Sequence, residues 1–101
     1  MAVVEITELL WDDQNIAHIA GHAVTVTEVS EVVFGGTALF FDLDRPDRPG
    51  RIAAFGVTTA GRPLAIYLDT PTGQGATYVL TARPMTTKER HTYDQLMEGE
   101  R

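Results

Sequence analysis

The sequence predicts an α+β fold, a small antiparallel β-sheet with two N-terminal helices and one C-terminal helix, in the order β-α-α-β-β-β-β-α. Three observations indicate this class. Helix-start patterns occur twice in the first third of the chain and once near its end. Four runs rich in aromatic or β-branched residues lie between them, and Gly- and Pro-containing turns separate those runs. With 101 residues, the chain forms one domain spanning residues 1–101.

The first strand and helix are predicted from an apolar run followed by a cap. Residues 6–11 are apolar with interspersed acids, which fits a strand that delivers Trp11 to the core. Asp12 follows as an N-cap, and Trp11 and Ile16 are placed as a hydrophobic staple. We therefore expect a short helix over residues 13–21, ending at Gly21.

The second helix begins at Thr25, which stands three residues before Glu28 in the capping-box relation. Its apolar side chains return at helical spacing, at Val26, Val29, Val32 and Val33. So many β-branched residues are poor helix formers, so tertiary packing must hold this helix. Gly35 and Gly36 end it.

The four remaining strands are expected to form an antiparallel meander over residues 37–43, 51–58, 62–69 and 76–82. Residues 44–50 are polar and broken by proline, which predicts a surface loop whose opposite charges neutralise one another. Residues 59–61 are short enough for a hairpin turn, and residues 70–75 form a longer one.

The final helix is predicted from a second capping box, Thr86 with Glu89, after the strand end at Pro84. Tyr93, Leu96 and Met97 recur at helical spacing and would pack this helix against the helix-covered face of the sheet. The opposite face is left either to water or to a partner. The acidic residues 97–101 are expected to fray.

The composition of the chain excludes or disfavours several classes of function. The chain has no cysteine, which excludes disulfides and thiolate chemistry, and no segment has the apolar length that crosses a bilayer. The first residues lack a basic region followed by an apolar run, so we expect no secretory signal and a cytoplasmic location. A net charge of −6 disfavours general nucleic-acid binding, because affinity for phosphates comes largely from cations. A locally basic surface remains possible in the C-terminal half, which contains Arg51, Arg62, Arg83, Lys88 and Arg90.

Two segments resemble the BrnT family of toxins, within the RelE-like group of small ribonucleases of type II toxin–antitoxin pairs. The first is residues 11–25, Trp-Asp-Asp-Gln-Asn-Ile-Ala-His-Ile-Ala-Gly-His-Ala-Val-Thr. The second is Ala-Arg-Pro-Met at residues 82–85, followed by Lys-Glu-Arg at 88–90 and by Tyr93. The resemblance runs from Ile6 to Tyr93. It implies a curved sheet with two N-terminal helices and one C-terminal helix, and an antitoxin partner encoded by the adjacent gene.

The chain departs from that family where the family commonly carries a lysine-bearing segment after Trp-Asp and a Lys/Arg-His-Gly-Val stretch. Two positive charges are missing as a result. The corresponding positions here are Gln14, Gly21, His22, Ala23 and Val24.

The resemblance implies metal-independent RNA cleavage, which needs a base, cations at the phosphorane and an acid for the leaving oxygen. His22 or Glu89 would be the base, and Lys88 or His91 the acid. Arg83 and Arg90 would hold the phosphate near the start of the final helix, where free N–H groups also favour an anion. Arg51 and Arg62 would add a second row of cations. The alternative for these arginines is pairing with local carboxylates.

Tyr93 would stack on a base or donate through its hydroxyl, although its helical spacing favours a place in the core. His18 and His22 are four residues apart and share a helix face, a spacing that can ligate a metal. No third ligand lies nearby in the sequence, so neither a metal site nor any other cofactor is expected.

Three functions therefore remain open at this point. The first is a BrnT-like RNA endonuclease, a hydrolase that an antitoxin silences. The second is a non-catalytic relative that keeps the fold as a protein-interaction module, in a hetero- or homo-oligomer. The third is a protein that binds a small anion or nucleotide at the start of the final helix.

Overall fold

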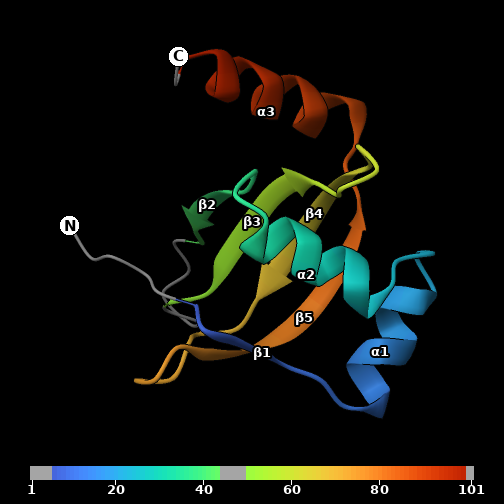
Figure 1. Ribbon diagram of the computed structural model, residues 1–101, viewed down its shortest axis with the longest axis vertical. Helices are drawn as coiled ribbons and strands as arrows, with labels where there is room; N and C mark the ends of the chain where they lie inside the picture. Colours follow the sequence, from blue (N-terminus) through green and yellow to red (C-terminus); the bar gives the residue numbers. More distant parts are fainter. Residues whose placement is uncertain (1–5, 44–49, 100–101) are drawn as a thin grey trace.

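A computed structural model describes residues 6–43 and 50–99 and confirms the predicted α+β class and the predicted order of elements. Most of the expected surface loop, at residues 44–49, lies outside the described residues. The elements are β1 (Glu8–Leu10), α1 (Asp13–Ala20), α2 (Val26–Phe34), β2 (Leu39–Asp42), β3 (Ile52–Val57), β4 (Pro63–Leu68), β5 (Ala76–Pro84) and α3 (Thr87–Gly99) (Figure 1).

The sheet is mixed, which corrects the expectation of an antiparallel one. Its strand order is β1-β5-β4-β3-β2, and β2 to β5 form the predicted antiparallel meander. β1 instead joins the edge beside β5 in parallel, with Leu9 opposite Thr77. The reason is the chain connectivity, because the helices and hairpins between the two strands bring β5 alongside β1 with both strands running in the same direction. An alternating sequence defines a strand's faces and not the direction of its neighbour.

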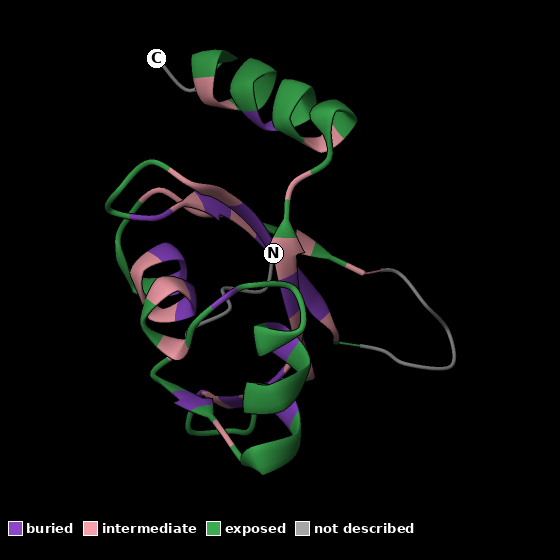
Figure 2. Cartoon of the chain, turned by 90° about the vertical axis from the view of Figure 1, so that its right-hand side faces the viewer, coloured by how far each residue is buried: buried purple, intermediate pink, exposed green. Residues whose placement is uncertain are grey.

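Both N-terminal helices cover one face of the sheet, α1 over β5 and α2 over β3 and β4. Each begins as predicted, with Asp12 and Thr25 as N-caps in complete capping boxes. The core lies beneath them, and Figure 2 shows its buried residues in purple on the strands and on parts of the helices. Its largest fully buried aliphatic side chains are Ile19, Val29, Val32, Ile52, Leu64, Ile66, Leu68 and Val79.

Close packing of α2 on the sheet depends on a small residue in β3. A Cβ added to Gly56 would lie 2.9 Å from a methyl group of Val32 and 3.1 Å from the backbone of Ala38. A larger residue there would have to push α2 or the start of β2 away.

α3 does not pack as predicted. It stands apart from α1 and α2, beyond the end of the sheet where β5 finishes (Figures 1 and 2). Tyr93 is buried at 5% exposure, but Leu96 is 43% exposed, so only part of the expected apolar stripe is covered. The helix also continues through Gly99, past the point at which fraying was expected, and residues 100–101 lie outside the described chain. The spacing of the apolar residues predicts which side of α3 is apolar, but it does not predict which element packs against that side. Part of the apolar stripe therefore stays exposed.

Candidate functional site

The structure brings Arg83 and Glu89 together, as a cluster that also includes Tyr67. Arg83 lies on β5 opposite Ala65, on the sheet face that α1 and α2 leave uncovered. Its guanidinium donates to both oxygens of the Glu89 carboxylate, at 2.6 and 2.8 Å, and to the Tyr67 hydroxyl at 3.1 Å. The same group lies 5.5 Å from the centre of the Tyr67 ring, within range of a cation–π contact.

Glu89 also completes the predicted capping box of α3. Its carboxylate accepts from the backbone N–H of Thr86 at 2.9 Å, and its own N–H donates to the Thr86 hydroxyl at 3.1 Å. The carboxylate therefore occupies the helix start where an external phosphate would have to bind.

Electrostatics make Glu89 a weak base. The hydrogen bonds from Arg83 hold the pKa of the Glu89 carboxyl far below its usual value, at about 2, against the opposing effect of burial. In the other direction, the hydrogen bond to Glu89 raises the pKa of Arg83. A general base works best with a pKa near the working pH. Glu89 is thus far more suited to holding Arg83 than to taking a proton from a hydroxyl group.

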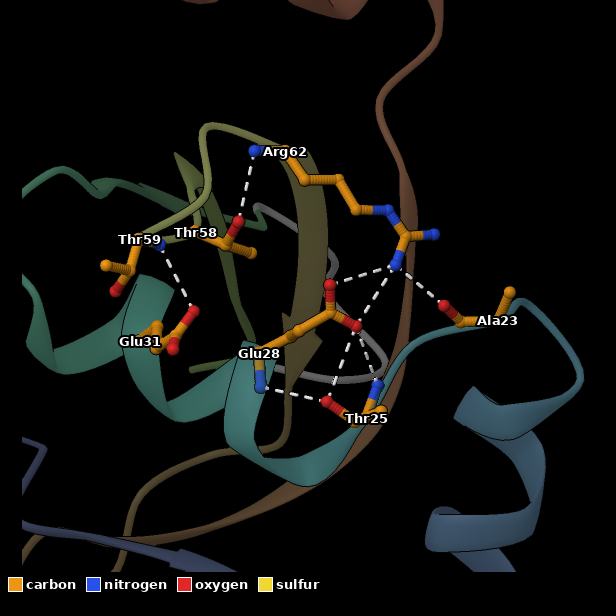
Figure 3. Close-up of polar contacts among 7 residues, drawn as sticks. All are labelled: Ala23, Thr25, Glu28, Glu31, Thr58, Thr59 and Arg62. Atoms are coloured by element: carbon orange, nitrogen blue, oxygen red, sulfur yellow. Dashed lines mark hydrogen bonds and ion pairs between the residues drawn. The ribbon is translucent and has the colours of Figure 1, made fainter.

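Arg62 lies in a second cluster, on the opposite face of the sheet (Figure 3). Its guanidinium donates to both oxygens of Glu28 at 3.0 Å and to the Ala23 carbonyl at 2.7 Å. Ala23 has a φ of 59°, an uncommon conformation for a residue with a side chain, at the turn between α1 and α2. Burial alone would raise the pKa of Glu28, but hydrogen bonds from Arg62 and Thr25 outweigh it and the pKa is lowered.

This second cluster is a structural clamp. Arg62 precedes β4, whereas its partners belong to the α1–α2 turn and to the first turn of α2. The neighbouring N–H of Thr59 donates to the carboxylate of Glu31, which ties the β3–β4 turn to the same helix (Figure 3). The contacts hold both turns in place and leave Arg62 occupied.

We expect Arg62→Met to lower the free energy of unfolding by about 2 kcal/mol, because it removes the guanidinium bonds to Glu28 and to the Ala23 carbonyl while keeping an apolar stem. Arg51→Met is the matched control. Among the described residues Arg51 makes one ion pair, at 3.3 Å, with an Asp69 side chain that is 43% exposed, so its loss should cost well under about 1 kcal/mol. Urea denaturation of both variants measures the difference, and equal losses would contradict the clamp.

The other predicted cations are dispersed. Arg51 adjoins the opposite end of β3 from Arg62, which lies opposite Thr58, so the two residues are about 23 Å apart along the strand. Arg90 pairs with Asp94 one turn further along α3, at 3.2 Å, with both side chains about half exposed. Lys88 is exposed and forms no ion pair with any residue that the structure describes.

The predicted histidines and Tyr93 lie in three separate places. His22 is exposed in the turn after α1, and its ring meets that of His18 edge-on at 5.4 Å. His91 is exposed and lines a shallow surface hollow on α3 with Asp94, Gln95, Met97 and Glu98. Tyr93 is buried and donates to the Thr37 carbonyl at 2.6 Å, and burial raises its pKa. Its hydroxyl therefore anchors α3 to the segment before β2.

The predicted site residues thus do not converge. Arg83 and Glu89 meet on the uncovered face, whereas Arg62 donates on the covered face to Ala23, the neighbour of His22 in the α1–α2 turn. Tyr67 is the residue that sequence reasoning missed. The period-two alternation of β4 could have placed it opposite to Leu64 and Ile66, but only the strand register brings it beside Arg83.

The geometry defines a small α+β domain in which each arginine of the described residues pairs with a carboxylate of the same chain. No family model matches the sequence, and no curated protein is detectably similar to it. Within residues 6–43 and 50–99, no group of three His, Cys, Asp or Glu side chains is placed to hold a metal ion. No helix in the described part of the chain combines the length and the apolar character needed to span a bilayer.

Proposed function

We propose that this protein is a non-catalytic protein-interaction module. One observation carries the proposal: each of the four arginines that sequence reasoning assigned to an anion site is held by a carboxylate of the same chain. The pairs are Arg51–Asp69, Arg62–Glu28, Arg83–Glu89 and Arg90–Asp94. A phosphate would have to displace those carboxylates, and a net charge of −6 opposes its approach.

Exposed apolar side chains support the same proposal. Leu10, Ile16, Phe34, Phe40 and Leu96 are each 38–50% exposed on a domain of only 101 residues. Phe34 and Phe40 are each three residues from Thr37, whose carbonyl anchors Tyr93, and Leu96 is three residues beyond Tyr93. Large apolar side chains that stay exposed on a small domain are typical of protein–protein contact surfaces. We place this interaction in the cytoplasm.

The test is recovery of a defined complex. The full chain, tagged and expressed in its own host, should co-purify with one protein, and the two purified proteins should re-form a complex with a Kd below about 1 µM. The product of the adjacent gene is the first partner to try. A protein that stays monomeric and captures nothing above a tag-only control would contradict the proposal.

A BrnT-like ribonuclease, silenced by an antitoxin, is the second candidate, and the Arg83 cluster favours it. Arginine, glutamate and tyrosine side chains meet there on an uncovered sheet face, and such groups can assist RNA cleavage. Expression should then arrest growth and purified protein should cut RNA, and Arg83→Ala should abolish both effects while Gln74→Ala, at an exposed position outside the predicted site, retains them. An RNA that stays intact with pure, folded protein rejects this candidate.

A further inference from the structure

The free edge of the sheet at β2 offers unpaired backbone groups at two residues. Leu43 donates its N–H to the Arg51 carbonyl at 2.8 Å, which identifies a hydrogen-bonded pair just beyond the strand. In an antiparallel ladder such pairs alternate with non-bonded ones, so Leu39 and Phe41 also face β3. The N–H and C=O groups of Phe40 and Asp42 therefore point away from the sheet. No other described segment is hydrogen-bonded to this edge.

The side chains of the same two residues lie on one face of this edge. Phe40 is opposite Ala54 and Asp42 is opposite Ile52, so both project on the face that α2 covers further in. Phe40 is 46% exposed, and Asp42 makes no ion pair within the described ranges. β2 has no lysine, proline or bulge that would prevent pairing, and the one charged side chain on this four-residue strand is Asp42.

The charge distribution indicates which strand would fit. The first 44 residues contain no Lys or Arg and eight acids: Glu5, Glu8, Asp12, Asp13, Glu28, Glu31, Asp42 and Asp44. β2 thus lies near the end of a 44-residue stretch without a basic side chain, and the next cations in the sequence are Arg45 and Arg48. A second copy would bring the same acids and another net charge of −6, which disfavours pairing of two β2 edges.

From these observations we infer that β2 binds an extended, basic segment of a partner protein, which adds a sixth strand to the sheet. The segment pairs its backbone with Phe40 and Asp42, sets an apolar side chain against Phe40, and places an Arg or Lys beside Asp42, two residues along on the same face. This inference rests on the proposed interaction function and specifies the surface and the chemistry of the partner.

The experiment uses two synthetic peptides and the full-length protein. The basic probe is the acetylated and amidated heptapeptide Thr-Arg-Thr-Val-Thr-Arg-Thr, and the control replaces both Arg residues by Glu. We expect the basic peptide to shift the NMR amide resonances of Phe40 and Asp42 and to bind at least tenfold more tightly than the acidic one. Asp42→Arg should reverse that preference. Asp13→Arg, the same charge change on α1, should alter the affinity less than threefold.

Three results would overturn the inference: no shift at the β2 amides, equal affinity for the two peptides, or the same effect from Asp13→Arg as from Asp42→Arg. A dimer in sedimentation that Phe40→Arg converts to a monomer would show that a second copy is the occupant, and would also overturn it. If the partner recovered with the whole protein binds Asp42→Arg unchanged, the inference fails and the proposed function stands. If the peptide binds at β2 but no partner protein can be recovered, the inference about the β2 surface stands and the proposed function fails.

Discussion

Asn15→Asp should be among the most destabilising substitutions in this protein, with an expected loss of about 3–5 kcal/mol in the free energy of unfolding. Asn15 is only 2% exposed. Its Nδ2 donates to the carbonyls of Leu10 and Val79, at 2.9 and 3.1 Å, and its Oδ1 accepts from the backbone N–H of Asp12. Aspartate has the same shape but no donor, so it would place a negative charge against two carbonyl oxygens. One side chain here joins β1, α1 and β5.

Gln14→Glu is the matched control for this prediction. It makes the same amide-to-carboxyl change one residue earlier, at an exposed position in the first turn of α1, and it should stay within about 0.5 kcal/mol of the wild type. Urea denaturation followed by Trp11 fluorescence measures both variants at pH 7. If the two substitutions cost the same, Asn15 does not hold the three elements together. Acidification towards pH 4 should recover part of the loss, because a protonated aspartate regains one donor.

Much of the fold could be predicted from short-range patterns. Every element was predicted in the correct order from the capping boxes at Thr25 and Thr86, the cap at Asp12 and the turn residues. This was possible because these interactions join residues at most four positions apart in the sequence. The parallel partner of β1 could not be predicted in the same way. Asn15 shows why: the predicted helix over residues 13–21 includes it without giving its side chain a role, yet its bond to Val79 spans 64 positions in the sequence.

The placement of Arg83 was beyond the reach of sequence patterns for a related reason. Thr77 and Val79 face the core, and strict alternation along β5 would turn residue 83 to the same side. A β-bulge at Leu80 shifts the pairing, so that Val79 lies opposite Leu68 while Thr81 lies opposite Tyr67. Ala82 then becomes buried and Arg83 emerges on the uncovered face, beside Tyr67. A single extra residue thus decides which groups the arginine meets.

The Arg83–Glu89 pair should make the stability of this protein depend on pH in a defined direction. The folded-state pKa of Glu89 is about 2, below the ordinary value of 4.5 that applies to the unfolded chain. A group whose pKa is depressed by folding stabilises the native state above its unfolded pKa, and that stabilisation is lost as the pH falls through the folded pKa. The contribution of Glu89 should therefore be complete above about pH 5 and should vanish between about pH 4.5 and pH 2.

Comparison of Glu89→Gln with the wild type isolates this contribution. The side chains of Glu89 and Arg83 are 20% and 32% exposed, so solvent screening reduces the expected loss at pH 7 to about 2–3 kcal/mol. The difference between the two proteins should shrink steadily in urea denaturation at pH 5, 4, 3 and 2.5. Asp94→Asn, which breaks the exposed Arg90–Asp94 pair, is the control, with an expected cost of at most about 0.5 kcal/mol. A Glu89→Gln loss that is small at pH 7, or that does not change down to pH 2.5, would mean that this carboxylate does not hold α3 to the sheet.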